Sequence, residues 1–204
     1  MDSAYFANAP EQIAFYCIIA LAVGCELAIR IYADLNSYRS RRNSKRSDSG
    51  SIFIVVLGLS GTICLSFFLA SDVMPVFIKQ LELPHLFYFF GIILIILGIV
   101  LRVASVLTLR KYFTVTVQTM KNHQLIQSGV YKHLRNPSYT GLLFISVGVA
   151  FSLGNVLAII CSTFIFTLCL HVRIKVEEKA LREQFKKEFD EYCSKTYRLI
   201  PFIW

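Results

Sequence analysis

Long apolar runs constrain the fold of this chain more than any other feature of its sequence. Residues 13–31, 52–70 and 86–107 form three such runs, each close to the ~20 residues that a helix needs to cross a bilayer. Of the 204 residues, 55% are hydrophobic and only 17% are charged, below the roughly 25% charge of soluble domains. The chain is therefore expected to be a membrane protein.

Two shorter apolar runs, residues 139–153 and 156–170, follow the three long ones. Gly154 and Asn155 separate them, and this dipeptide is typical of a tight turn. The sequence therefore predicts an all-α integral membrane protein with about five transmembrane helices, the last two forming a helical hairpin.

The distribution of basic residues predicts how the chain crosses the membrane. The formal net charge is +8, and residues 39–51, between the first two runs, carry five Lys or Arg, whereas Lys79 is the only one between the second and third. Because basic loops stay on the cytoplasmic side, we expect an outside or lumenal N-terminus and a cytoplasmic C-terminus. Residues 108–138 then form a cytoplasmic loop.

The same distribution argues against other classes of partner. Nucleic-acid binding needs basic residues over a polar face, interleaved with aromatics, whereas here they lie between apolar runs. The expected partner is the lipid bilayer, with no nucleic acid. Five of the six cysteines lie inside apolar runs and none forms a CxxC pair, so neither a metal site nor a disulfide framework is expected. The oligomeric state stays open.

The C-terminal segment, RIKVEEKALREQFKKEFDEYCSK, has the pattern of an amphipathic helix. Leu181, Phe185, Phe189 and Tyr192 recur at helical spacing among charged residues. Residues 112–120 instead alternate and are rich in β-branched side chains, which predicts an extended or irregular segment.

A polar cluster, GVYKHLRNPSYTG at residues 129–141, lies where the fourth apolar run begins. Pro137 suits the first turn of a helix, which makes Asn136 its expected N-cap, with a side chain that accepts from exposed amides. A helix N-terminus can also hold an anion. The alternative is that this is only a capped helix start.

A second polar cluster, RIKVEE at residues 173–178, follows the fifth run. Arg173 and Glu177 are four residues apart, so they share a helix face, and the hairpin brings both toward the first cluster. Charged residues that reach from two helix ends to the membrane surface are the alternative, but this explains adjacent glutamates poorly. We therefore expect a shared site.

Three charged residues interrupt the apolar runs themselves. Glu26 and Arg30 are four apart and are expected to pair with each other. Arg102 lies inside the third run, where a charge costs ~2.5–3.5 kcal/mol at the centre of a bilayer and less near its edge. Arg102 either extends toward the membrane surface or points into the same site.

Together these motifs resemble the isoprenylcysteine carboxyl methyltransferase family and its relatives among the phospholipid methyltransferases. The likeness extends from about Arg102 to Pro201, with H-x-L, G-x-Y, R-x-P-x-Y-x-G, R-x3-E-E-x2-L and a terminal R-L-I-P in the family's order. It divides the chain into two N-terminal helices with a basic loop, residues 1–71, and a methyltransferase-like region, residues 85–204.

The resemblance implies an enzyme that uses S-adenosyl-L-methionine and a lipid-like or prenylated acceptor. In such an enzyme Arg110 lies on the acceptor side, and Glu178 is catalytic as well as cofactor-binding. The implied cofactor-binding residues are His123, Gln124, Leu125, Ile126, Gly129, Tyr131, Arg135, Asn136, Pro137, Tyr139, Arg173, Glu177 and Glu178.

One position departs from the family pattern, because Asn136 stands where the family usually has histidine. Asparagine hydrogen-bonds but does not titrate near neutral pH, which disfavours a base at this position. Transfer to a carboxylate needs no base, since the nucleophile is already an anion.

Other functions stay open at this point. A sterol or steroid reductase that binds NADPH has a related C-terminal layout, although no additional basic pocket for its 2′-phosphate is evident. A non-catalytic scaffold or small transporter is the third possibility. Within the methyltransferase reading, the acceptor is a prenylated cysteine carboxylate, a phospholipid amine or another hydrophobic molecule.

Overall fold

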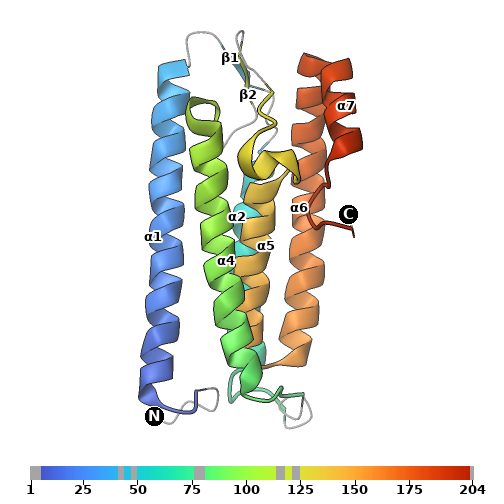
Figure 1. Ribbon diagram of the computed structural model, residues 1–204. Coiled ribbons are helices and arrows are strands. Elements are labelled where there is room, and N and C mark those ends of the chain that lie inside the picture. Colours follow the sequence, from blue (N-terminus) through green and yellow to red (C-terminus); the bar gives the residue numbers. More distant parts are fainter. Residues whose placement is uncertain are drawn as a thin grey trace.

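The chain forms an elongated helical bundle in the computed structural model, which describes residues 6–40, 44–46, 50–75, 81–113, 118–120 and 125–202. Figure 1 shows long helices side by side, with the N-terminus at one end; the other end, which carries β1, β2 and α7, is called the loop end below. The helices are α1 (Ala9–Ser40), α2 (Ser51–Leu69), α4 (Leu86–Leu109), α5 (Pro137–Ser152), α6 (Val156–Phe185) and α7 (Lys187–Lys195).

Short elements occupy the loop end. Strands β1 (Ser44–Arg46) and β2 (Gln118–Met120) pair antiparallel. β2 confirms extended backbone in part of residues 112–120, whereas Tyr112, at the start of that segment, belongs to a 3₁₀ turn. Two 3₁₀ turns, η1 (Arg110–Tyr112) and η2 (Gly129–Lys132), follow α4 and precede α5. His123 and Gln124 lie outside the described residues.

The predicted membrane architecture is confirmed, with one difference in length. Among the described residues, four helices (α1, α2, α4 and α6) are long and apolar enough to cross a bilayer. The predicted fourth span is α5, which has 16 residues; at 1.5 Å per residue it falls short of the ~30 Å hydrocarbon layer. Most of its residues are buried, because it lies inside the bundle among α2, α4 and α6.

Glycines allow α4 and α5 to approach closely. A Cβ at Gly98 would lie 2.6 Å from the Gly141 carbonyl oxygen, and a Cβ at Gly148 would lie 2.8 Å from that of Gly91. On each helix the two glycines are seven residues apart, so they share one face. Small residues let helix backbones pack closely in membranes, and this contact fixes α5 at the centre of the bundle.

Buried hydroxyl groups join α2 to its neighbours. The Thr62 and Ser146 hydroxyls lie 2.8 Å apart, between α2 and α5, and those of Ser66 and Ser162 lie 2.9 Å apart, between α2 and α6. Such bonds are one means by which helices associate inside a bilayer. The N-terminal helix pair and the C-terminal region therefore share one packed bundle.

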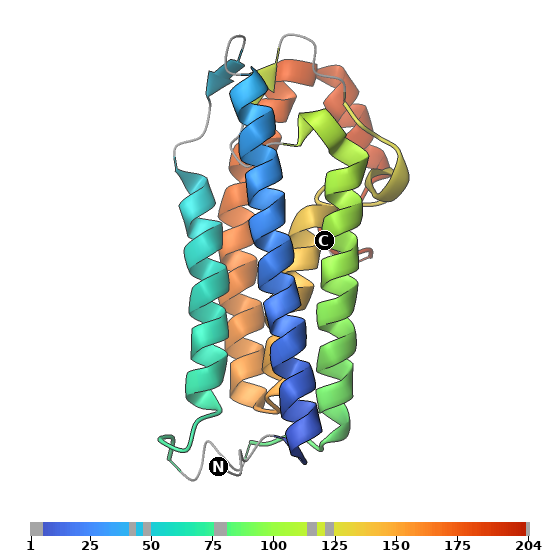
Figure 2. The same ribbon diagram turned by 90° about the vertical axis from the view of Figure 1, so that its left-hand side faces the viewer.

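α1 runs alongside α4 in the same direction (Figure 2) and is tied to it at three levels. At the end opposite the loops, His85 Nε2 lies 2.8 Å from a Glu11 carboxylate oxygen. At mid-height Arg102 bonds Glu26 at 2.7 and 2.8 Å. At the loop end Asn36 donates to the Arg110 carbonyl at 3.2 Å.

The C-terminal half departs from the prediction in one respect. α6 continues without interruption through the fifth apolar run and the RIKVEE cluster to Phe185, because the first charged residues mark the edge of the apolar zone rather than a helix end. The helix breaks at Lys186, whose φ is +50°. The predicted stripe from Leu181 to Tyr192 is therefore shared between two helices, and Phe189 and Tyr192 are the buried residues of α7.

Candidate active site

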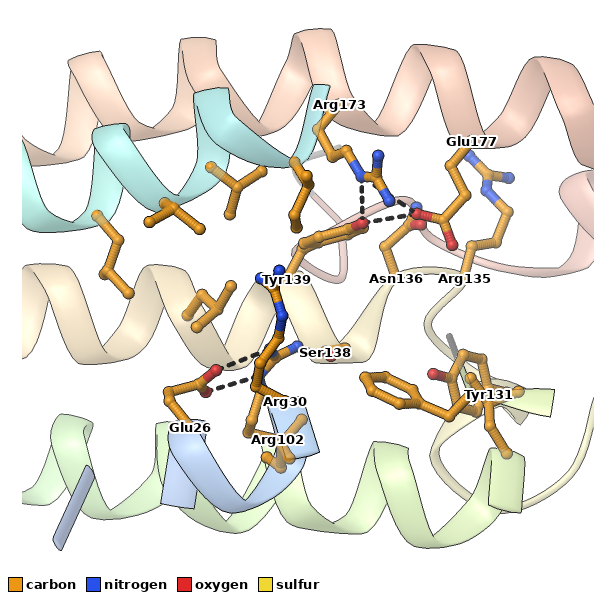
Figure 3. Close-up of a pocket in the computed structure, with 18 of the residues that line it drawn as sticks. Glu26, Arg30, Arg102, Tyr131, Arg135, Asn136, Ser138, Tyr139, Arg173 and Glu177 are labelled. Carbon is orange, nitrogen blue, oxygen red and sulfur yellow. Dashed lines mark hydrogen bonds and ion pairs between the residues drawn. The ribbon is translucent and has the colours of Figure 1, made fainter. Parts of the chain in front are cut away.

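A cavity of about 500 Å³ opens inside the bundle toward the loop end, a volume in the range of small-molecule sites. Residues of α1, α2, α4, α5, α6 and α7 line it. Figure 3 shows charged side chains converging from several helices on this space. One part of the lining is charged, with Arg135 just before α5 and Arg173, Glu177 and Glu178 on α6; the other, from α1 and α2, is mostly aliphatic apart from Glu26 and Arg30.

Glu178 is the centre of the charged part. Its carboxylate is buried and accepts from Arg198 Nη2 at 2.8 Å and from Arg198 Nε at 3.2 Å. Arg135 Nε lies 3.3 Å away. Because an uncompensated buried charge is costly, these two guanidinium groups stabilise the carboxylate. They also connect α6 to the residues just before α5 and to the C-terminal segment.

Tyr139 connects the two predicted polar clusters. It accepts from Arg173 Nε at 2.9 Å and donates to Glu177 Oε2 at 2.6 Å, as Figure 3 shows. Arg173 is 2% exposed and also donates to the Ser51 hydroxyl at the start of α2. The two polar clusters therefore converge as predicted. Arg173 and Glu177 lie 3.9 Å apart on one face of α6.

Asn136 lies at the predicted position, but its side chain has a different partner. It precedes α5, with Pro137 as the first helical residue, and makes no side-chain capping bond. Its amide instead donates to the Arg198 carbonyl at 3.1 Å and toward Glu178 at 3.4 Å. Asn136 is therefore the N-cap residue as predicted, but the predicted capping hydrogen bond is absent, because the C-terminal segment competes for the Asn136 side chain.

The C-terminal segment after α7 pairs with the start of α5. The amide of Arg135 donates to the Tyr197 carbonyl at 2.8 Å, and the amide of Tyr197 donates to the His133 carbonyl at 2.9 Å. Thr140 donates to the Leu199 carbonyl at 2.7 Å. The terminal R-L-I-P motif thus holds the start of α5 in place.

Two tyrosines add neutral donors. The Tyr192 hydroxyl donates to the Tyr131 carbonyl at 2.7 Å. Burial raises the pKa of Tyr131 well above its usual range, and the nearby charge of Glu177 adds to this; burial also raises the pKa of Tyr192. Both side chains line the cavity and are protonated at neutral pH.

An ion pair lies between the charged and aliphatic parts of the lining. Arg102 bonds both carboxylate oxygens of Glu26 and donates to the Ser138 hydroxyl. Arg30 pairs instead with Asp34 at 3.4 Å. The expected Glu26–Arg30 pair is therefore wrong in this structure, because α1 turns Glu26 toward α4, where a more buried arginine is available.

The structure brings together most of the residues that the resemblance implies. Gly129 and Pro137 shape the backbone near the cavity without lining it, and Arg110 ends α4 with an exposed side chain outside the lining; its role on the acceptor side stays a prediction. The lining includes Leu125, Ile126, Tyr131, Arg135, Asn136, Tyr139, Arg173, Glu177 and Glu178.

Four lining or supporting residues had no assigned role from the sequence: Ser51, Ser138, Tyr192 and Arg198. Arg198 belongs to the R-L-I-P motif, and that was the only available signal for it. Within the part of the chain that the structure describes, no group of three or more His, Cys, Asp or Glu could hold a metal ion.

Known proteins match most of this chain. Residues 91–183 match the "Isoprenylcysteine carboxyl methyltransferase (ICMT) family". The chain is 32% identical over 189 residues to the protein-S-isoprenylcysteine O-methyltransferase of Saccharomyces cerevisiae, covering 91% of this chain and 78% of the yeast protein. The chain belongs to the ICMT family. The resemblance predicted from the motifs is confirmed.

Other ICMT relatives match over the C-terminal part. A probable protein-S-isoprenylcysteine O-methyltransferase of Oryza sativa subsp. indica is 35% identical over 115 residues, which cover 55% of this chain and 60% of the rice protein. The chain thus matches about three fifths of that relative's length. A solved structure, titled as the eukaryotic intramembrane Ras methyltransferase ICMT, is 29% identical with a TM-score of 0.57, covering 76% of this chain and 53% of that chain.

Proposed function

We propose that this ICMT-family chain is a membrane methyltransferase that uses S-adenosyl-L-methionine to O-methylate the carboxylate of an isoprenylated cysteine or a similar hydrophobic acceptor. The observation that carries the proposal is one cavity with two kinds of lining, charged toward the loop end and aliphatic between α1 and α2. A charged cofactor and a lipid-like acceptor need these two surroundings to meet at one point.

The charged lining fits the cofactor's chemistry. Glu177 is one-third exposed, and among the described residues only its Oε2 has a hydrogen bond, which leaves a carboxylate oxygen for a cationic group. Arg135 also lines the cavity, and its positive charge suits the cofactor's carboxylate. When bound, S-adenosyl-L-methionine supplies an electrophilic methyl group to the acceptor oxygen while its sulfur keeps the electron pair of the broken S–C bond.

The residues that would hold the cofactor have distinct tasks. Glu177 and Tyr139 provide a fixed carboxylate and phenol, and Arg173 keeps the phenol in place from behind. Glu178 acts through Arg135, Asn136 and Arg198, whose positions it fixes. We assign Glu178 a supporting task on the cofactor side, since both of its carboxylate oxygens already have partners.

The acceptor side of the cavity needs a cation and an apolar surface. Arg102 lies between the two parts of the lining, and Val23, Leu27, Val56 and Leu59 line the same cavity from α1 and α2. A carboxylate oxygen near Arg102 would be oriented toward the charged lining without any proton transfer. Proximity and orientation then supply most of the acceleration, which is consistent with a non-titrating Asn136.

We place the loop end in the cytoplasm and the N-terminus outside or in a lumen. The basic segment at residues 39–51 supports this orientation, and it puts the charged lining next to a solution that contains a soluble cofactor. The two N-terminal helices, residues 1–71, would then contribute mainly acceptor surface, and residues 85–204 the cofactor site.

No observation favours the reductase or the scaffold over a methyltransferase. The test is binding of the full chain in detergent or nanodiscs to S-adenosylhomocysteine and to NADPH, followed by thermal unfolding. Stabilisation by S-adenosylhomocysteine alone supports the proposal. Stabilisation by NADPH alone would replace it with a reductase, and stabilisation by neither would favour a non-catalytic role.

A further inference from the structure

Glu26 already occupies the place on Arg102 where an acceptor carboxylate is needed. Arg102 Nε lies 2.7 Å from one oxygen of Glu26 and Nη2 lies 2.8 Å from the other. This two-point contact is the geometry with which arginine binds any carboxylate. The third guanidinium nitrogen, Nη1, donates to Ser138, so each nitrogen of Arg102 has a partner.

The pair therefore presents little net charge to an incoming anion. An acceptor carboxylate that approached Arg102 would meet the carboxylate of Glu26 at the same time, and two carboxylates repel at such a distance. Both side chains line the cavity, and Glu26 is 28% exposed whereas Arg102 is 12% exposed. Glu26 is thus the partner with room to move.

A second cation lies within reach of Glu26 on its own helix. Arg30 is one turn further along α1 and also lines the cavity; Figure 3 shows it beside Glu26 and Arg102. A Glu followed by Arg four residues later is the favourable order for a helix pair. In this structure Arg30 makes only a 3.4 Å contact with Asp34, and both side chains are about half or more exposed.

The rest of α1 need not move for Glu26 to change partner. The Glu11–His85 contact and the Asn36–Arg110 contact hold α1 against α4 near its two ends. A change in the side chain of Glu26 alone moves its carboxylate away from Arg102. Arg102 keeps a second neighbour in either case, since the Phe113 ring centroid lies 6.0 Å from its guanidinium carbon.

From these contacts we propose that Glu26 is a resident substitute for the acceptor carboxylate. When the acceptor binds, its carboxylate replaces Glu26 on Arg102, and Glu26 transfers to Arg30. Glu26 thereby keeps Arg102 neutralised inside the bundle while the site is empty, and it sets how strongly the site prefers an anionic acceptor over a neutral one. This proposal rests on the proposed function, since it takes the acceptor to be a carboxylate.

The exchange and a purely structural Glu26–Arg102 ion pair predict different ratios of affinity for a carboxylate acceptor and for its uncharged carboxamide. The probes are tritiated S-farnesyl-N-acetylcysteine and its carboxamide, which differ only in the charge of the acceptor group. Their dissociation constants are measured by scintillation proximity on the full chain in nanodiscs with S-adenosylhomocysteine bound. Glu26→Gln is expected to tighten carboxylate binding by about tenfold, and to leave carboxamide binding within about twofold, since a charged competitor becomes a neutral one.

Two further variants complete the test. Arg30→Gln, which removes the second partner of Glu26, is expected to weaken carboxylate binding several-fold without changing carboxamide binding. Glu82→Gln removes an exposed carboxylate at the opposite end of the bundle and should leave the ratio of the two affinities unchanged. This control separates the exchange from a general effect of net charge.

The outcomes that overturn the exchange are specific. If Glu26→Gln weakens carboxylate binding, or changes both affinities equally, Glu26 only positions Arg102. If Glu26→Gln does not fold, the test rests on Arg30→Gln, and an unchanged ratio of carboxylate to carboxamide affinity in that variant contradicts the proposal. If the wild-type chain methylates the carboxylate but neither variant changes the ratio, the exchange alone fails. If the wild-type chain neither binds nor methylates it, the proposed function fails first and the exchange with it.

Discussion

Arg198 and Glu178, twenty residues apart in the sequence, form a two-point ion pair, half-buried on the arginine side, that joins the C-terminal segment to α6. Glu178 also lines the cavity, so the pair connects the C-terminal segment to the cavity wall. Arg135 and Asn136 contact the same carboxylate from the start of α5. The order of the charged lining therefore depends on one side chain of α6, and that side chain can be tested alone.

Removing the charge of Glu178 should disturb both stability and cofactor binding. In Glu178→Gln the partly buried guanidinium groups of Arg135 and Arg198 lose their counter-charge, and each lost charge-assisted hydrogen bond is worth ~1.5–3 kcal/mol. We expect a lower unfolding temperature and at least about tenfold weaker binding of S-adenosylhomocysteine by calorimetry. Glu191→Gln, an exposed position on α7, is the matched control and should change neither quantity.

Asn136 should tolerate histidine better than leucine. A histidine ring can donate to the Arg198 carbonyl as the Asn136 amide does, whereas leucine cannot, and a buried unsatisfied acceptor costs ~1–3 kcal/mol. S-adenosylhomocysteine affinity in Asn136→His is expected to stay within a few-fold of the wild type. Equal losses in both variants would show that the amide donor is not what matters at this position.

The local features of this fold were predictable from the sequence and the distant pairings were not. Pro137 at the helix start, the turn at Gly154 and Asn155, and the shared face of Arg173 and Glu177 all depend on residues a few positions apart. Backbone geometry alone decides such relationships. They also account for the predicted convergence of the two polar clusters at the mouth of one hairpin.

Glu26 shows why the distant contacts escaped prediction. Arg30, four residues away, is the obvious partner on the helix, but Arg102, 76 residues away, has the contact because the direction of α1 along α4 presents Glu26 to it. Likewise, Asn136 follows the rule for caps in position only, because the C-terminal segment competes for its amide. Tertiary packing decided both cases.

Tyr131 should act as a neutral donor across the working pH range. Its pKa is raised by burial. The dependence of the methyl-transfer rate on pH between about pH 6 and 9 should therefore be the same in Tyr131→Phe as in the wild type. A raised phenol pKa contributes stability below the unfolded value of about 10 and loses it as pH rises further. The unfolding temperature should therefore fall above about pH 10, and by less in Tyr131→Phe than in the wild type. A rate titration that vanished in Tyr131→Phe would give the phenol a role in proton transfer.

Arg102 and Arg110 compete for the acceptor side, and their variants separate them. Arg102 lines the cavity, whereas Arg110 is exposed at the end of α4. We expect Arg102→Met to lower kcat/KM for a carboxylate acceptor by about 100-fold, as expected for a lost bidentate contact, and Arg110→Ala to lower it much less. The reverse order would return the acceptor contact to Arg110, as the resemblance implies.

The most direct test of the account is methyl transfer itself. The full chain in nanodiscs is incubated with methyl-tritiated S-adenosyl-L-methionine and with either S-farnesyl-N-acetylcysteine or its carboxamide, and Glu177→Gln serves as the variant with one carboxylate fewer at the cofactor site. The account predicts a base-labile methyl ester on the carboxylate compound, none on the carboxamide, and a loss of rate in Glu177→Gln. Label that appeared on phospholipid amines instead, or on neither compound while S-adenosylhomocysteine still bound, would contradict it.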